Sequence, residues 1–308
     1  MIPCDLEAKH IELPPTDQHT IVLFTDASHG ELLCERFALR VQQDFGDQVL
    51  AWFMYQPQVD SGPPQSLWVR IWTSVTRELR LVYHRPSVVF SWFDKSWTML
   101  QDRLGGRHPL AVAQDRMLGE EIRSLRTAGK LSPIPIDDSS RAECVAQVQR
   151  LNPYFFLSLG ETPNVDELRP AVRGIMLNQH VGWCPDHRGA HSVYWAMYHR
   201  ELGRLGATIH ASVLEANAGP IFRRAPACLL PHDDALNCYV RSAVLGTELM
   251  CETVGELVAK KRATVFEQPC RRGLTHRAED LDREVRQRIR EDFAGQWLGT
   301  ELRRARDY

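Results

Sequence analysis

Residues 20–55, "TIVLFTDASHGELLCERFALRVQQDFGDQVLAWFMY", decide the fold class of this chain. The stretch begins with an apolar run at 20–26 and ends with a second one at 48–55. Between them, apolar residues recur at the spacing of an amphipathic helix. Runs that are apolar on both faces are typical of parallel strands buried between layers of helices. The stretch therefore predicts a βαβ unit and an α/β domain built on a parallel sheet with helices on both faces.

The same alternation of apolar runs and helical patterns continues along the rest of the chain. It predicts an open sheet, whose functional groups gather where the strands end at their carboxyl edge. We expect strands at 132–136, 154–160, 174–180, 207–215 and near 222–230, and helices at 140–151, about 191–203 and 232–259.

Three segments lie outside this core. Residues 1–19 are interpreted as an irregular lead-in, and 57–140 as a helical insertion rich in Trp and Arg. Such a mixture could stack on a nucleic acid, but amphipathic helices with buried Trp and solvated Arg explain it better. The tail at 259–308 predicts a helical extension that ends in an amphipathic helix, which is a candidate homodimer contact. The core itself is expected to span 20–258.

Composition excludes several classes of protein. Hydrophobic residues make up 44% of the 308 residues and charged residues 25%, which is ordinary for a globular protein. The net charge of −2 gives no general attraction to nucleic acid. No apolar run is long enough for a membrane span, and nothing resembles a secretion signal, so we expect a cytoplasmic protein without a membrane partner. The eight Cys, none in a CxxC pair, are expected to be reduced thiols.

The motif "LNQHVGWCPDHRGAH" (177–191) follows directly from a predicted strand and carries the chemistry. One interpretation is a zinc site, because one Cys and three His would share one face of a continuous helix. Two Gly and one Pro interrupt that helix, however. The four residues of this interpretation are His180, Cys184, His187 and His191.

Two further interpretations use fewer residues of the motif. Cys184 could be a nucleophile activated by a nearby His, although it precedes Pro185 in a loop. Alternatively, Asn178 and His180 could work together, because residues i and i+2 of a strand point to the same side. An Asn amide can donate to a developing oxyanion, and a neutral His can take a proton from an attacking amine. This pair would suit acyl transfer without a covalent enzyme intermediate.

At this point the sequence resembles a known family. The stretch "LNQHVGWCPDHRGAHSVYWAM" (177–197) is similar to the signature of the 10-formyltetrahydrofolate-dependent formyltransferases. A second block of that family, Thr-Ile-His followed by an Asp-x-Gly-Pro-Ile turn, resembles "ATIHASVLEANAGPI" (207–221). The likeness covers roughly 140–258 well and 20–55 loosely.

The resemblance implies a Rossmann-like α/β formyltransferase fold with 10-formyltetrahydrofolate as the formyl donor. It also implies an amine or hydroxylamine of a small metabolite as the acceptor, in the setting of specialised metabolite biosynthesis. A tRNA acceptor is disfavoured because only some 50 residues follow the core. Asn178 would stabilise the oxyanion and His180 would shuttle protons. The folate contacts implied are Leu159, Gly160, Glu161, Ala211, Val213 and Glu215.

Asn217 departs from the family, because it stands where the family has a catalytic Asp. An Asn keeps the shape of that side chain but loses the charge that favours a protonated His. The protein could be a slower formyltransferase, a binding protein for a folate or a partner, or a hydrolase of formyltetrahydrofolate. A strand histidine such as His210 is interpreted as a packed polar residue. Carboxylates that could replace the missing one are Asp186, Glu215, Asp233 and Asp234.

Overall fold

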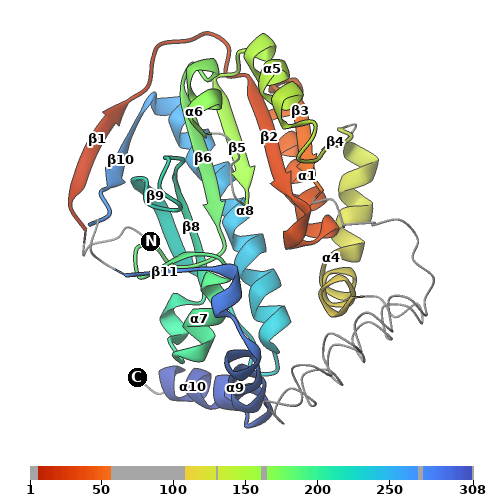
Figure 1. Cartoon of the computed structure of the whole chain (residues 1–308), viewed down its shortest axis with the longest axis vertical. Helices are drawn as coiled ribbons and strands as arrows, with labels where there is room; N and C mark the ends of the chain where they lie inside the picture. Colours follow the sequence, from red (N-terminus) through yellow and green to blue (C-terminus); the bar gives the residue numbers. More distant parts are fainter. Residues whose placement is uncertain (1–5, 57–107, 130, 161–164, 270–272, 307–308) are drawn as a thin grey trace, which may run out of the picture. The chain divides into compact units, whose positions relative to one another are not determined.

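The computed structural model describes residues 6–56, 108–129, 131–160, 165–269 and 273–306. The chain divides into two compact units, Met1–Pro57 with Ala113–Tyr308 and Gln58–Val112. Only residues 108–112 of the second unit are described, so most of the expected insertion, including its four Trp, lies outside the described residues. The fold below is that of the first unit (Figure 1).

A nine-stranded sheet forms the centre of the first unit among the described residues. Five neighbouring strands run parallel in the order β4-β3-β2-β5-β6, which confirms the predicted βαβ unit and α/β class. The parallel strands are β2 (Ile21–Asp26), β3 (Val49–Tyr55), β4 (Ile134–Ile136), β5 (Phe155–Leu159) and β6 (Ile175–His180).

The other half of the sheet is antiparallel, in the order β6-β8-β9-β10-β1. The prediction of a parallel sheet therefore holds for one half only. The connection at 212–220 is too short for the crossover that parallel strands need, so β8 and β9 pair as an antiparallel hairpin. The antiparallel strands are β8 (Gly206–Ala211), β9 (Ile221–Pro226), β10 (Arg262–Phe266) and β1 (Ala8–Glu12).

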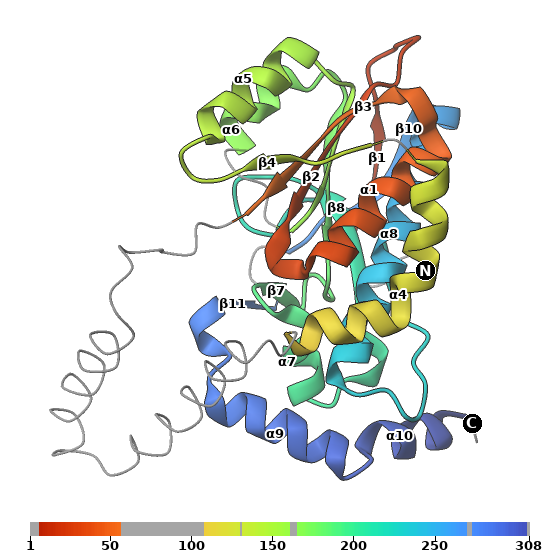
Figure 2. The ribbon, with the colours of Figure 1, turned by 90° about the vertical axis from the view of Figure 1, so that its right-hand side faces the viewer.

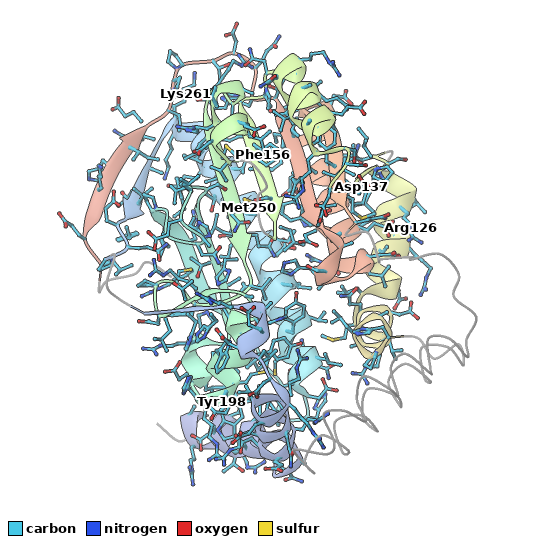
Figure 3. All side chains as sticks on the ribbon, in the orientation of Figure 1. Arg126, Asp137, Phe156, Tyr198, Met250 and Lys261 are labelled. Carbon is cyan, nitrogen blue, oxygen red and sulfur yellow. The ribbon has the colours of Figure 1, made fainter. Side chains whose placement is uncertain are left out.

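Helices cover both faces of the sheet (Figure 2). One face packs on α5 (Arg141–Leu151), α6 (Val165–Leu168) and the short turn after it, through a buried apolar cluster. The opposite face packs on α1 (Glu31–Phe45) and the long α8 (Ala235–Lys260). Figure 3 shows the side chains that fill these layers, with the fully buried Phe156 and Met250 among them.

Residues at the helix ends explain where α1 and α8, the two helices on the second face of the sheet, begin and end. Helix α1 begins after Gly30 and ends at Gly46, and both glycines have a positive φ. Helix α8 begins at Asp234, whose carboxylate accepts the backbone N–H of Asn237. Helix α4 (Pro109–Ala128) is also present, as expected for a helical segment at 57–140. None of the described helices has the length and apolarity that a bilayer crossing requires.

Strand β4 lies within the strand expected at 132–136 and confirms it. Two predicted segments, however, contain strands that the sequence does not reveal. The lead-in at 1–19 contains β1, an edge strand with mostly exposed side chains, so it lacks an apolar run. The tail at 259–308 contains β10 and β11 (Leu274–His276) before its helices. These strands form through backbone pairing with distant strands, which is not a local property of the sequence.

The tail returns to the motif at 177–191. Strand β11 pairs in parallel with β7 (His187–Gly189), which is a three-residue strand inside that motif. Helix α9 (Arg283–Ala294) packs on α7 (Ser192–Tyr198) and on α8, and α10 (Trp297–Arg306) follows it. The predicted amphipathic helix is thus present, and the segment before it contributes to the same edge of the sheet as the motif.

Candidate active site

A cleft of about 480 Å³ opens at the carboxyl ends of the central parallel strands. Asp26 at the end of β2, Gly160 just after β5, and Asn178 and His180 of β6 line it. Asn217, from the hairpin between β8 and β9, completes this side of the cleft. Open α/β sheets bind their ligands at this edge. The structure thus brings together the three residues that sequence analysis selected for chemistry.

Hydrogen bonds fix the orientation of the Asn178 side chain. Its Oδ1 accepts a hydrogen bond of 2.9 Å from the hydroxyl of Ser158, on the neighbouring strand β5. Its Nδ2 then lies 3.3 Å from Asn217 Oδ1 and 3.3 Å from His210 Nε2. An amide nitrogen only donates, so the donor hydroxyl of Ser158 and the acceptors Asn217 Oδ1 and His210 Nε2 leave one consistent orientation. Asn178 presents its donor group toward the cleft residues.

His210 belongs to this cluster rather than to the packed core. Its Nδ1 lies 2.8 Å from the carbonyl oxygen of Ala211, which only accepts, so Nδ1 carries a proton. In the neutral ring, Nε2 accepts from Asn178, and it also lies 3.2 Å from Asn217 Oδ1. Burial lowers the pKa of His210, against the opposing effects of the nearby oxygen atoms of Ala211 and Asn217. His210 is therefore a neutral member of the site.

His180 is anchored by a different group. Its Nε2 lies 3.2 Å from the backbone oxygen of His187, so Nε2 donates and the neutral ring carries its lone pair on Nδ1. Burial first, and the nearby His210 second, lower the pKa of His180 to about 3. At neutral pH this ring is therefore uncharged, with its lone pair on Nδ1. Asn217 Oδ1 accepts from Asn178 Nδ2 and lies 3.2 Å from His210 Nε2, so its polar neighbours are these two side chains.

The hairpin that carries Asn217 has a constrained backbone. Asn217 has a φ of 54°, in the left-handed region that Asn tolerates better than most residues. A Cβ atom at Gly219 would lie 1.9 Å from the carbonyl oxygen of Ala211, so only glycine fits there. Gln268 of the tail donates to the carbonyl oxygens of Asn217 and Gly219 at 2.9 and 2.6 Å. The tail therefore holds the hairpin in place.

The expected folate contacts are only partly gathered at the cleft. Gly160 and Val213 line it, whereas the Leu159 side chain is fully buried in the sheet. Ala211 lines a separate cavity at the other side of the antiparallel strands. Glu161 lies outside the described residues. Glu215 is exposed and forms an ion pair of 3.3 Å with Arg188.

The four candidate replacement carboxylates have structural partners, and none is among the residues that line the cleft. Glu215 pairs with Arg188, and Asp186 lies 3.5 Å from Arg204. Asp233 binds Arg241 at 2.7 Å, and Asp234 caps α8. The carboxylate that does line the described part of the cleft is Asp26, whose Oδ1 accepts the backbone N–H of Ser28. Its position at the end of the first predicted strand was the available signal.

The two alternative chemistries of the motif find little support. The Cys184 thiol is fully buried, and burial raises its pKa to about 12, the opposite of what a reactive thiolate requires. Within the ranges that the structure describes, no group of three or more His, Cys, Asp or Glu is placed to hold a metal ion.

The cleft is unusually rich in histidine. Five His line it, and loss of hydration is the largest cause that lowers the pKa of each of them. At neutral pH the rings are therefore uncharged and act as hydrogen-bonding groups and proton acceptors. The five are His29, His180, His191, His210 and His276.

Comparisons with known proteins give weak likenesses. No family model matches the chain. A sugar N-formyltransferase from Shewanella sp is 15% identical, with 85% of this chain and 78% of that chain covered and a TM-score of 0.47. A 4-N formyltransferase from Francisella tularensis is 13% identical over 85% and 78% of the two chains, with a TM-score of 0.46.

A third solved structure is a formyltransferase from Anoxybacillus kamchatkensis in complex with UDP-4,6-dideoxy-4-formamido-L-AltNAc and tetrahydrofolate. It is 20% identical, with 53% of this chain and 82% of that chain covered and a TM-score of 0.38. At these identities and TM-scores the likenesses carry no conclusion about the activity of this chain.

Proposed function

We propose that this chain is a formyltransferase that moves a formyl group from 10-formyltetrahydrofolate to an amine or hydroxylamine nitrogen of a small metabolite. The observation that carries the proposal is the placement of Asn178 and His180. They lie two residues apart on β6, they line one cleft at the carboxyl edge of the sheet, and their segment resembles the signature of that family. An amide donor and a neutral imidazole at one cleft are the groups that formyl transfer requires.

Asn178 would stabilise the oxyanion that forms when the acceptor nitrogen attacks the formyl carbon. The hydroxyl of Ser158 holds its Oδ1, so its Nδ2 is already oriented as a donor before the reaction begins. Donors that need no reorientation stabilise a developing negative charge most effectively.

His180 would accept the proton that the acceptor nitrogen loses as the new C–N bond forms. Its Nε2–H is held by the backbone oxygen of His187, so the proton would arrive at Nδ1. The same proton would pass to the folate nitrogen as its bond to the formyl carbon breaks. Because the pKa of His180 is about 3, the ring gives the proton up readily.

Replacing Asn178 by Ala tests the oxyanion role. We expect kcat/KM to fall by roughly 10²–10³, the effect of losing one oxyanion donor, with little change in folate affinity. Gln149→Ala, an exposed position of α5, serves as the control and should retain full activity. A variant with Asn178→Ala that turns over like the parent protein would refute the assignment.

A folate-binding protein without turnover is the second candidate. It is favoured by Asn217, which puts an uncharged amide beside Asn178 and His210 where the family has a carboxylate. A third possibility is hydrolysis of 10-formyltetrahydrofolate, with water as the acceptor.

One incubation separates these candidates. The purified protein is mixed with 10-formyltetrahydrofolate and a panel of primary amines and O-alkylhydroxylamines, and the products are identified by mass spectrometry. A formylated acceptor supports the transferase, formate alone the hydrolase, and bound folate without product the binding protein. Absence of folate binding would exclude all three.

A further inference from the structure

A chain of hydrogen bonds that the formyltransferase motif does not explain leads from the cleft to the surface. His276, on β11 of the tail, lines the cleft, and its Nε2 lies 3.2 Å from His187 Nδ1. The other ring nitrogen of His187, Nε2, lies 2.5 Å from a carboxylate oxygen of Glu201. The His187 side chain is 5% exposed, whereas Glu201 is 29% exposed and reaches solvent.

The proton positions in this series of hydrogen bonds follow from the carboxylate of Glu201. An ionised carboxylate only accepts, so His187 donates through Nε2–H. In the neutral ring, His187 Nδ1 must then accept, so His276 donates through Nε2–H and carries its lone pair on Nδ1. Trp195 stacks on the His276 ring at 4.4 Å between centroids and 9° between planes, which holds that ring in orientation. Each link can therefore pass a proton toward Glu201.

Charged and titratable groups contact each of the three hydrogen-bonded residues His276, His187 and Glu201. Arg204 binds the second carboxylate oxygen of Glu201 at 2.5 Å. His199 stacks on His187 at 5.9 Å. Burial, then the proximity of His187, lower the pKa of His276 to about 4, against the opposing effect of Asp280. At neutral pH His276 is therefore uncharged and keeps a lone pair on one ring nitrogen.

Formyl transfer to an amine releases a proton that this chain can remove. A primary amine with a pKa near that of Lys, about 10.4, enters a neutral solution as an ammonium without a lone pair. The balanced reaction of an ammonium with formyltetrahydrofolate gives an amide, tetrahydrofolate and one free proton. His180 can pass one proton from the amine to the folate nitrogen. The second proton has to leave before the attack.

We propose that His276, His187 and Glu201 form a relay that takes this proton from the bound ammonium to solvent; the proposal rests on the function proposed above. In one concerted shift, the ammonium proton moves to His276 Nδ1, the Nε2 proton of His276 moves to His187 Nδ1, and the Nε2 proton of His187 moves to Glu201, so that neither ring has to hold a full positive charge. Glu201 then releases a proton to water. No bond other than these N–H and O–H bonds changes, and the amine becomes a nucleophile.

The variant Glu201→Gln tests the relay with the smallest change of shape. Its amide oxygen still accepts from His187, but it cannot take up a proton. With a primary amine at pH 7, we expect kcat/KM to fall by roughly 10²-fold, the lower end of the usual range of general acid–base effects. The loss should shrink as the pH rises toward the pKa of the amine. With an O-alkylhydroxylamine, whose nitrogen is already neutral at pH 7, the variant should match the parent protein.

Glu35→Gln is the matched control, because Glu35 also forms an ion pair with an Arg, Arg126, but contacts no relay residue. It should leave the rates with both acceptors unchanged. A second variant, His276→Gln, should reproduce the acceptor and pH dependence of Glu201→Gln. If Glu201→Gln loses rate equally with both acceptors at every pH, or loses none with the amine, the relay is wrong.

Nuclear magnetic resonance of ¹⁵N-histidine-labelled protein separates a failure of the relay from a failure of the proposed function. If the parent protein formylates neither acceptor, the proposed function fails. Independently, a coupled chain predicts that Glu201→Gln shifts the ring ¹⁵N resonances of both His187 and His276, while Glu35→Gln shifts neither. If the His276 resonances do not respond to Glu201→Gln, the hydrogen-bonded connection between Glu201 and His276 is wrong, whatever the activity.

Discussion

Asn217 determines whether the site has a negative charge beside its histidines. Its Oδ1 lies against the Nδ2 of Asn178 and the Nε2 of His210. The neutral amide helps to orient Asn178 but adds no charge that would stabilise an imidazolium. The missing charge therefore affects mainly the pKa of His210, which lies next to Asn217. His180 instead donates to the backbone oxygen of His187.

Asn217→Asp would restore the charge without changing the shape. A carboxylate oxygen about 3 Å from His210 Nε2 should raise the pKa of His210 by about 1–3 units and increase kcat/KM for formyl transfer. Titration of the His210 ring by nuclear magnetic resonance and steady-state rates would measure the two effects. Asn152→Asp makes the same change at another left-handed Asn, at the end of α5, and should change neither. An unchanged or lower rate in Asn217→Asp would show that the site works through other groups.

The sequence reveals the part of the site that is local along the chain. Asn178 and His180 can be paired because a strand alternates its side chains. His210 joins them only because β8 pairs with β6 in a register that sets His210 opposite Asn178. Asp26 and His276 come from strands on either side of the motif, more than 80 residues away from it. Such residues could not be assigned from spacing, because register and strand order bring them together.

At the scale of single elements, side-chain hydrogen bonds fix β6 to α8. Gln179, between the two candidate catalytic residues, donates from Nε2 to the carbonyl oxygen of Ala243 at 2.7 Å and accepts from Thr247 at 3.3 Å. Gly246 leaves room for this side chain, since a Cβ there would lie 2.5 Å from Gln179 Nε2. The contact fixes the strand that carries Asn178 and His180.

Gly246→Ala and Gly255→Ala, both within α8, should have opposite effects on stability. Ala is favoured over Gly inside a helix by about 1 kcal/mol. At Gly246 the new methyl group would displace the Gln179 side chain, which makes two hydrogen bonds to α8. We therefore expect the free energy of unfolding to fall by about 1–3 kcal/mol, together with a lower kcat. At Gly255 no atom lies within 4 Å of the new Cβ, so a small gain is expected. Urea denaturation of both variants measures the difference, and equal effects would contradict this account of the strand.

Elements with strong apolar periodicity are recovered from the sequence, and pairing-dependent elements are not. Strands β2, β3, β5 and β6 have apolar side chains on both faces, which gives a clear pattern. Strand β1 has mostly exposed side chains, and β7 and β11 have three residues each, so their existence depends on partner strands. The tail strand β11 matters most, because it delivers His276 to the cleft.

At the scale of the whole molecule, the fold keeps several histidines uncharged at the edge of its sheet. Desolvation lowers the pKa of His180 to about 3 and that of His276 to about 4. In the unfolded chain these rings would titrate near 6.5. Below that pH the unfolded state binds more protons than the folded state, so folding and proton binding oppose each other. Acid should therefore destabilise this protein before its carboxylates are protonated.

We predict that the free energy of unfolding falls as the pH decreases from about 6.5 toward the pKa values of the folded state. Each such histidine contributes about 1.4 kcal/mol per pH unit in that window, so His180 and His276 together account for about 2–3 kcal/mol between pH 6 and 5. Urea denaturation at pH 7, 6 and 5 gives the slope directly. Replacing His180 by Gln should remove about half of this contribution, because the ring that must become charged in the unfolded chain is gone. A stability that stays constant from pH 7 to 5 would mean that the folded protein protonates these rings, and the neutral cleft on which the proposed proton transfers depend would then be wrong.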